Sequence, residues 1–320
     1  KRFRLFMKAR KIIDSKYYNL YIHITDVWNT VPCKSPLPMN EYNKCGSEEE
    51  SHLSIASLPY NFFYKNCSLF KGNDRSCFTI KFLIDKDGVI HNHDIFKSHI
   101  VSNMRLRIKD FNYITNSSVN DNYELFKTLY ELSSAIRVKR LSKRFASVKT
   151  ESSDKGNMTV QELMILVNHY IAKHFKERNL PFSYCTQDCK NMKDTMLLLE
   201  SKIKNEKNLT LIKDYIKSDL EGMIYSSIIT SHNDLCLDAY SSFTKPMLDY
   251  LSYVNQGPVN DLLIGYPTDE RIDYYKNLYE EIVPKLNEMQ MLETLYKLQK
   301  RKEESIAETI LNNEKVKRKQ

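Results

Sequence analysis

The chain has 320 residues and a formal charge of +8, with 48 Lys and Arg against 40 Asp and Glu. Hydrophobic residues make up 42% of it and aromatic residues 11%, which is enough for a packed core and excludes a disordered chain. It has only 7 glycines and no GxGxxG or GxxxxGKS/T sequence, which excludes glycine-rich nucleotide-binding loops.

The cysteines and the hydropathy indicate the surroundings of the protein. The 7 cysteines are odd in number and irregularly spaced, which predicts reduced thiols inside the cell, in the cytoplasm or the mitochondrial matrix. No apolar run approaches the roughly 18 residues of a membrane span, so no membrane partner is expected. The excess of basic residues is compatible with a polyanionic partner.

Residues 1–11 form a basic N-terminal segment, and the first acid of the chain is Asp14. Such a segment is either a solvated edge or a contact surface for RNA phosphates. Its candidate RNA contacts are Arg2, Arg4, Lys8, Arg10 and Lys11.

Alternation of apolar and polar residues over Asn19–Val27 predicts a strand with one buried side. The side chains expected to point inward are Leu20, Ile22 and Ile24. Cys77–Ile84 and Val89–Ile100 are also strand-like, and the Asp87-Gly88 pair between them is typical of a hairpin turn.

Three short sequences stand at fixed spacing before this hairpin: Leu58-Pro59, Cys67-Ser68-Leu69 and Arg75. His91 and His93 would share one side of the second hairpin strand. No Cys or His pair elsewhere has zinc spacing, so we expect no metal there. Cys185 and Cys189 are read as free thiols for the same reason.

Helical periodicity runs from Asn120 to Phe145. Basic residues crowd the end of this helix: Arg137, Lys139, Arg140, Lys143 and Arg144. These side chains either complement the helix dipole in solvent or form a stripe for RNA or a protein partner.

The polar stretch Ser147–Asn157 is predicted to be a loop, and Thr159 with Glu162 a capping box that opens the next helix. One apolar face of that helix is formed by Val160, Leu163, Met164, Val167, Ile171 and Phe175. Residues 190–230 are predicted to hold two or three further amphipathic helices.

Leu237–Gln256 is the stretch around which the chain is interpreted. Pro246 stands near a predicted helix start, where its missing N–H costs nothing. Met247, Leu251 and Val254 follow at helical spacing. A further helix is predicted from Asp269 to an interruption at Pro284, and residues 267–320 as a whole are predicted to be a charged helical extension.

The stretch Leu237–Gln256 resembles the phosphate-binding sequence of the RNase II/RNase R exoribonuclease family (the RNB domain), roughly A-x-x-x-F-T-S-P-I-R-R-Y-x-D-x-x-x-H. The matching positions are Ala239, Phe243, Thr244, Pro246 and Tyr250. The paired arginines of the family fall on Leu248 and Asp249. Its aspartate falls on Ser252 and its histidine on Gln256.

Other stretches carry the resemblance over most of the chain. The family has LP, CSL and Arg at the spacing found over residues 58–75, and its VHIADVS strand matches Tyr21–Trp28. One family helix matches at Glu162, Met164, Asn168 and Ala172. The resemblance implies an α+β fold with a mixed sheet flanked by helices, over residues 12–266.

The resemblance also implies a chemistry that this chain lacks. Family members hydrolyse RNA from its 3′ end with Mg²⁺ held by aspartates in a D-x-x-x-x-x-D-x-D-D-A cluster. Counted back from the VHIADVS-like strand, D-x-D-D-A falls near Phe3–Met7 or Leu5–Ala9, and neither window contains a carboxylate. A pseudoenzyme is therefore expected, with no catalytic residue, metal or cofactor.

We expect such a chain to bind RNA, with Arg75, Lys245 and Tyr253 as further candidate contacts. Its expected role is that of a subunit among protein partners in a ribonucleoprotein, such as a ribosome or mitoribosome. One alternative is a divergent Mg-dependent 3′–5′ exoribonuclease whose metal ligands come from elsewhere. Another is an adaptor that binds only protein.

Overall fold

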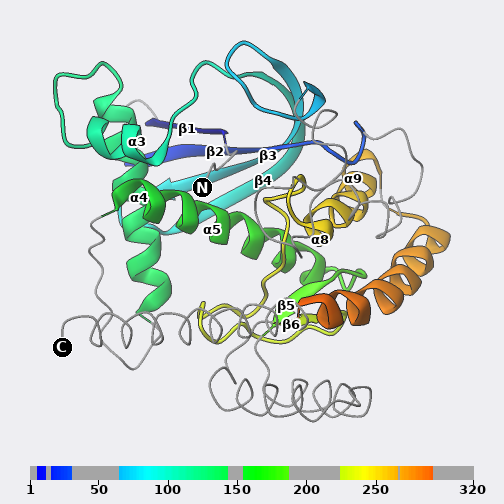
Figure 1. The fold of residues 1–320 in the computed structure, drawn as a ribbon. Coiled ribbons are helices and arrows are strands. Elements are labelled where there is room, and N and C mark those ends of the chain that lie inside the picture. Colours follow the sequence, from blue (N-terminus) through cyan, green and yellow to red (C-terminus); the bar gives the residue numbers. More distant parts are fainter. Residues whose placement is uncertain are drawn as a thin grey trace, which may run out of the picture.

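The computed structural model describes residues 6–11, 16–30, 65–142, 154–186, 224–265 and 267–290, and for residues 6–11 the backbone only. Within these residues, a four-stranded sheet has helices packed on one face (Figure 1). One of these helices, over residues 155–177, runs from this sheet toward a separate two-stranded sheet.

The larger sheet has the order β1-β2-β3-β4. Its strands are β1 (Phe6–Lys11), β2 (Tyr17–Thr25), β3 (Asp74–Asp85) and β4 (Ile90–Val101). The α+β class and the strands predicted from alternation are confirmed. A mixed sheet was predicted, but the strand pairs in the described part of the chain are all antiparallel, because neighbours in the sheet are also consecutive in the chain.

The predicted turn at Asp87-Gly88 joins β3 to β4. Asp85 Oδ1 accepts hydrogen bonds from the N–H groups of Asp87 and Val89, both at 3.0 Å. Gly88 has φ +77°, and a Cβ on it would lie 2.6 Å from the carbonyl carbon of Ala135. Glycine is therefore required both for the turn and for the close approach of a neighbouring helix.

The prediction of one buried side for β2 is only partly right. Leu20, Ile22 and Ile24 are buried as expected, but His23 and Thr25 on the opposite side are buried too. His23 Nδ1 lies 2.8 Å from Thr79 Oγ1 of the neighbouring strand. This hydrogen bond offsets the cost of burying the imidazole.

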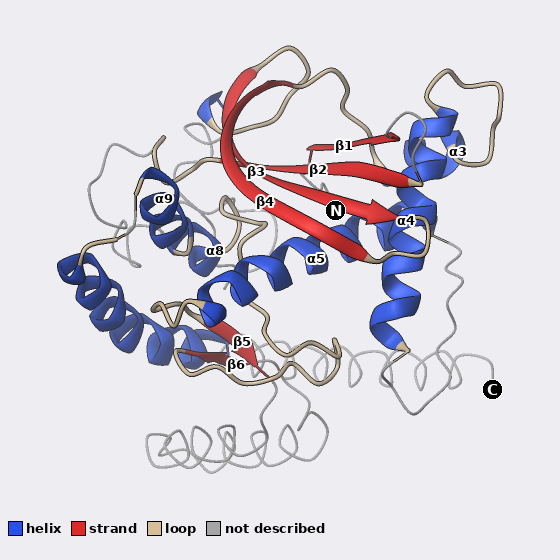
Figure 2. Ribbon diagram, turned by 180° about the vertical axis from the view of Figure 1, so that it is seen from behind, coloured by secondary structure: helices blue, strands red, loops and turns tan. Residues whose placement is uncertain are grey.

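Three helices follow the sheet: α3 (Ile108–Ile114), α4 (Tyr123–Leu141) and α5 (Lys155–Glu177). Figures 1 and 2 both show α5 crossing one face of the sheet with α4 beside it. The rings of Phe82 in β3 and Tyr170 in α5 meet edge to face at 5.1 Å. The apolar face predicted for α5 is confirmed, since all six of its residues are buried.

The predicted start of α5 is wrong. The helix begins at Lys155, and Asp154 is its N-cap, with Oδ1 accepting from Asn157 N at 3.0 Å. Thr159 and Glu162 lie inside the helix and are buried. Aspartate is among the best N-cap residues, so the helix begins after Asp154 rather than after Thr159.

The chain then forms a two-stranded antiparallel sheet of β5 (Tyr184–Thr186) and β6 (Ile224–Ser226). Helices were predicted over residues 190–230, but residues 224–226 are a strand. The rest of that prediction, residues 190–223, lies outside the described residues.

Two short helices follow, α8 (Tyr250–Val254) and α9 (Gln256–Ile264), and then a helix over residues 269–290. This last helix was predicted to break at Pro284 but is continuous there. Pro284 is exposed, so the carbonyl that loses its helical partner can bind water. The helix is held by buried Tyr275, Tyr279 and Ile282. Residues 291–320 lie outside the described part of the chain.

Candidate functional site

The candidate site lies where the C-terminal end of β2 meets α8 and α9. The helix predicted near Pro246 begins only at Tyr250, because Asp249 is the N-cap of α8. Asp249 Oδ2 accepts from Ser252 N at 3.1 Å, from Ser252 Oγ at 2.5 Å, and from the Ser242 hydroxyl. A carboxylate thus caps the helix at one of the positions where the family has its paired arginines.

The other family positions in this stretch are also built differently. Leu248 exposes 54% of its surface and Ser252 is buried. Gln256, at the position of the family histidine, is fully buried. Its Oε1 accepts from Val27 N at 2.9 Å and from Trp28 N at 3.0 Å. Its Nε2 donates to the Thr25 carbonyl at 2.8 Å, so one amide fastens the start of α9 to the end of β2.

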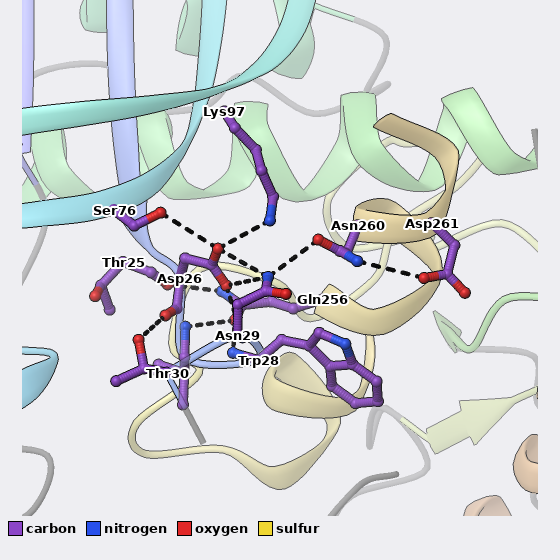
Figure 3. A network of polar contacts seen from close by, with 11 residues as sticks. Thr25, Asp26, Trp28, Asn29, Thr30, Ser76, Lys97, Gln256, Asn260 and Asp261 are labelled. Carbon is purple, nitrogen blue, oxygen red and sulfur yellow. Dashed lines mark hydrogen bonds and ion pairs between the residues drawn. The ribbon is translucent and has the colours of Figure 1, made fainter. Parts of the chain in front are cut away.

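Asp26 is the central acid of this site, and its partners are drawn in Figure 3. Its side chain is 1% exposed. Lys97 Nζ lies 3.1 Å from Asp26 Oδ2, and Ser76 Oγ lies 3.4 Å from the same oxygen. Asn29 Nδ2 donates to both carboxylate oxygens at 2.9 Å. The carboxylate therefore has a fixed counter-ion and several hydrogen bonds from its own chain.

The network continues from Asn29 into α9. Asn29 Nδ2 also lies 3.0 Å from Asn260 Oδ1 (Figure 3). The next residue, Asp261, accepts from Arg271 Nε at 2.7 Å and from the Tyr275 hydroxyl at 2.8 Å. A chain of polar contacts thus connects the end of β2 with the helix over 269–290.

Two thiols lie near Asp26. Burial raises the pKa of Cys67 and of Cys77 to about 12. Both thiols are therefore protonated at neutral pH, as is typical of buried structural cysteines.

Residues 6–11 of the basic N-terminal segment form β1, which pairs with β2. Phe6 is the register partner of His23, Met7 of Ile22 and Ala9 of Leu20. The second of the two windows counted for the family aspartates, 5–9, thus falls largely on an edge strand next to the β2 end. That strand has no acidic residue. Among the described residues, no group of three or more His, Cys, Asp or Glu side chains is placed to hold a metal ion.

The two predicted hairpin histidines have different surroundings. His91 Nε2 lies 2.8 Å from Asp85 Oδ2. The centroid of the His93 ring lies 4.7 Å from that of Tyr170 and 6.4 Å from that of His174. Burial lowers the pKa of His93.

The basic stripe predicted at the end of α4 is only partly a surface. Arg140 donates to both oxygens of Glu162, with Nη2 at 2.8 and 3.0 Å, and Arg137 Nη1 lies 3.0 Å from Glu162 Oε1. Glu162 is 1% exposed and Arg140 9%. These two arginines neutralise a buried acid, whereas Lys139 is exposed. Lys143 and Arg144 lie outside the described residues.

Tyr253 does not present its ring to solvent, as an RNA contact would require. It is 1% exposed, and its ring packs 5.6 Å from that of Trp28. Arg75 donates to the carbonyls of Asp74, at 2.8 Å, and Lys65. Lys245 is exposed.

The remaining candidates belong to the N-terminal segment. Lys8, Arg10 and Lys11 belong to β1, of which only the backbone is described. Arg2 and Arg4 fall outside the described residues.

Sequence reasoning missed the partners of Asp26. Lys97 is the one that left a signal: it is the register partner of Phe78, a fully buried residue of β3. A lysine at an inward position of an alternating strand indicates an acid nearby. Asn29 and Asn260 follow no spacing that would have identified them.

The fold and the polar joint between β2 and α9 can be compared with those of known proteins. The RNB domain matches residues 7–264. The chain belongs to the RNB domain family.

Relatives agree with this assignment. Ribonuclease R of Thermotoga maritima is 27% identical over 316 residues, covering 83% of this chain and 44% of the relative. RNase R of Mycoplasma genitalium, solved in complex with double-stranded RNA, has a TM-score of 0.69 at 16% identity and covers 92% of this chain and 61% of that one. Yeast Ssd1, described as a pseudonuclease, has a TM-score of 0.58 at 15% identity, covering 90% and 43%. The chain thus spans less than half the length of the Thermotoga enzyme. Within the described part, no helix is long and apolar enough to cross a membrane.

Proposed function

We propose that this chain is a non-catalytic, RNA-binding member of the RNB domain family. The observation that carries the proposal is that β1, on which the second window counted for the family aspartates largely falls, has no acidic residue. The buried acid just beyond β2, Asp26, already has the Lys97 ammonium as a counter-ion. A hard divalent cation would have to displace that ammonium and the Asn29 amide before it gained an oxygen ligand.

The neighbouring elements support the same proposal. The strand paired with the end of β2 carries Lys8, Arg10 and Lys11 and no acid. The cap formed by Asp249 adds negative charge where paired arginines would stabilise a phosphoryl group. The fold is shared with yeast Ssd1, which is itself described as a pseudonuclease.

RNA binding is the part of the family function that the chain can retain. Its formal charge is +8, and RNase R of Mycoplasma genitalium, which shares its fold, was solved with RNA. We further propose that the protein acts as a subunit with protein partners in a ribonucleoprotein, such as a ribosome or mitoribosome, in the cytoplasm or the mitochondrial matrix.

The test is incubation of the purified chain with 5′-labelled single-stranded RNA and Mg²⁺ or Mn²⁺, followed by denaturing and native gels at two salt concentrations. Intact RNA and a complex that weakens with salt are expected. Stepwise 3′ trimming that stops with EDTA would refute the proposal.

The same experiment separates the two alternatives. The curated relatives are ribonucleases R, which favours the divergent exoribonuclease, and trimming would support it. Intact RNA without any complex would instead support an adaptor that binds only protein.

A further inference from the structure

The sheet face opposite α5 is partly open. Leu20, Ile22 and Ile24 of β2 point into the core, so the alternate residues of the strand lie on the other face. The half of that face near the start of β2 is not buried, in contrast to the half around His23. Most of its residues are half-buried, and Asn92 and Asp94 are exposed. By register its residues, here named the open sheet face, are Tyr17, Asn19, Tyr21, Lys81, Leu83, Asp85, Asn92 and Asp94.

The open sheet face combines aromatic rings with ammonium groups. Lys16 Nζ lies 5.4 Å from the ring centroid of Tyr17, and Lys81 Nζ lies 5.9 Å from that of Tyr21. The Tyr21 ring is nearly parallel to that of His23, with 5° between the planes and 6.5 Å between the centroids. With a rise of about 3.3 Å per residue, Tyr17 and Tyr21 stand about 13 Å apart along one strand.

The edge strand beside this face is basic. In β1, Lys8 is the register partner of Tyr21 and Arg10 that of Asn19. Among the acids, Asp85 is engaged by His91 and by two backbone N–H groups. Asp94 is exposed. By register, Lys8, Arg10 and Lys81 thus stand against Asp85 and Asp94 on this half of the sheet.

We propose that the open sheet face is a platform for single-stranded RNA, with bases stacked on Tyr17 and Tyr21 and phosphates bound by Lys16 and Lys81. The inference rests on the RNA-binding function proposed above and assigns it a surface. The aromatic rings of a four-stranded sheet stack unpaired bases, while a duplex hides its base faces. An exposed cation–π contact is weak, at about 0.5–1 kcal/mol, so a lysine can leave its ring for a phosphate.

The platform lies away from the stretch that resembles the family's phosphate-binding sequence. Tyr17 begins β2, whereas Asp26 and the Gln256 joint lie beyond its other end. RNA on the platform would therefore be bound whatever the fate of the former catalytic site.

The chain offers a matched control for the lysines. In α4, Lys127 Nζ lies 5.5 Å from the ring centroid of Tyr123. This pair has a similar cation–π distance but lies on a helix, away from the sheet. Lys127→Glu changes the net charge by the same amount as Lys81→Glu.

The experiment measures the affinity of the purified chain for a fluorescent oligouridine by anisotropy. Base–aromatic stacking contributes about 1–3 kcal/mol, so Tyr21→Leu should weaken binding at least about fivefold. Lys81→Glu should also weaken it and flatten its salt dependence. Tyr21→Phe keeps the ring, and Lys127→Glu lies off the platform; both should stay within about twofold. Thermal melts confirm that each variant is folded.

A second measurement locates the RNA directly. Ultraviolet crosslinking with 5-iodouridine RNA should label the peptide that contains Tyr17 and Tyr21. Wild-type binding that neither Tyr21→Leu nor Lys81→Glu weakens, with crosslinks elsewhere, would overturn the platform and leave the RNA-binding function standing. An equal loss in Lys127→Glu would also overturn it. No binding by the wild type would refute both proposals.

Discussion

Lys97 Nζ lies 3.1 Å from Asp26 Oδ2, with the lysine side chain 31% exposed and the carboxylate 1% exposed. The carboxylate is thus removed from water, and its counter-ion comes from a neighbouring part of the same sheet. Asn29 and Ser76 supply further hydrogen bonds. An acid in this position is a structural element of the joint between β2 and α9.

Replacing Lys97 with Met should therefore destabilise the fold. The substitution keeps most of the length of the side chain and leaves Asp26 buried without its counter-ion. Breaking a buried pair costs about 3–5 kcal/mol, and the partial exposure of Lys97 lowers our expectation to about 1–3 kcal/mol. Urea denaturation measures the free energy of unfolding.

Two comparisons identify the cause of that loss. Asp26→Asn added to Lys97→Met should recover much of it, because the neutral amide needs no counter-ion. Lys285→Met removes an exposed pair with Glu281 and should cost at most about 0.5 kcal/mol. A double variant as unstable as Lys97→Met would show that the charge of Asp26 is not responsible.

Gln256→Ala should be among the more destabilising substitutions in α9. It leaves the Trp28 N–H without this partner, while the Val27 N–H and the Thr25 carbonyl keep only their 3.1 Å hydrogen bond to each other. One unsatisfied buried group costs about 1–3 kcal/mol, and the two groups that each lose one of their hydrogen bonds add to this, so a loss of about 2–4 kcal/mol is expected. Gln161 is exposed on α5, and Gln161→Ala should change the unfolding free energy by about 0.5 kcal/mol or less. Similar losses in the two variants would contradict the role of the Gln256 amide in holding α9 to the end of β2.

Gln256 also shows which parts of the candidate site a sequence can reveal. The family frame placed Gln256 at the histidine position, so the departure was visible in the sequence. Its partners Val27 and Trp28 lie more than 200 residues away in the chain. They were not predictable, because only the packed fold brings the end of β2 onto α9.

The same limit explains the error over Thr159 and Glu162. Their spacing is that of a capping box, which is a local rule. A tertiary contact decides the role of Glu162, because two arginines from α4 meet it in the core. The strands were predictable because alternation is a local consequence of one buried face.

Glu162→Gln should destabilise the protein strongly. It removes the negative charge that faces Arg137 and Arg140, of which Arg140 is largely buried. The expected fall in the free energy of unfolding is about 3–5 kcal/mol. Glu131 is exposed on α4, and Glu131→Gln serves as the control with little expected change. A loss in Glu162→Gln no larger than in this control would contradict the buried ion triad.

Substitutions of Arg140 and Lys139 should have different effects, one on stability and the other on RNA affinity. Arg140→Ala should lower the melting temperature, because it also removes the hydrogen bond from Nη1 to the Leu235 carbonyl. Lys139→Glu should leave the melting temperature nearly unchanged, because Lys139 is exposed. If the stripe on α4 contributes to RNA binding, only Lys139→Glu should lower the RNA affinity of the folded protein. Anisotropy at a temperature well below both transitions tests this.

The stability of the fold should fall in mild acid because of two histidines, the buried His232 and the half-buried His174. Burial is the main cause that lowers the pKa of His174 and of His232 to about 4, from an ordinary value of 6.5. As the pH falls, the unfolded chain therefore binds protons before the folded one. This contribution to stability is complete above about pH 6.5 and is lost progressively from there toward pH 4. His174→Gln should make the unfolding free energy less dependent on pH in this window, and His99→Gln, at an exposed site, should not. Urea denaturation between pH 4.5 and pH 7.5 measures both slopes, and an unchanged slope in His174→Gln would contradict the assignment to this residue.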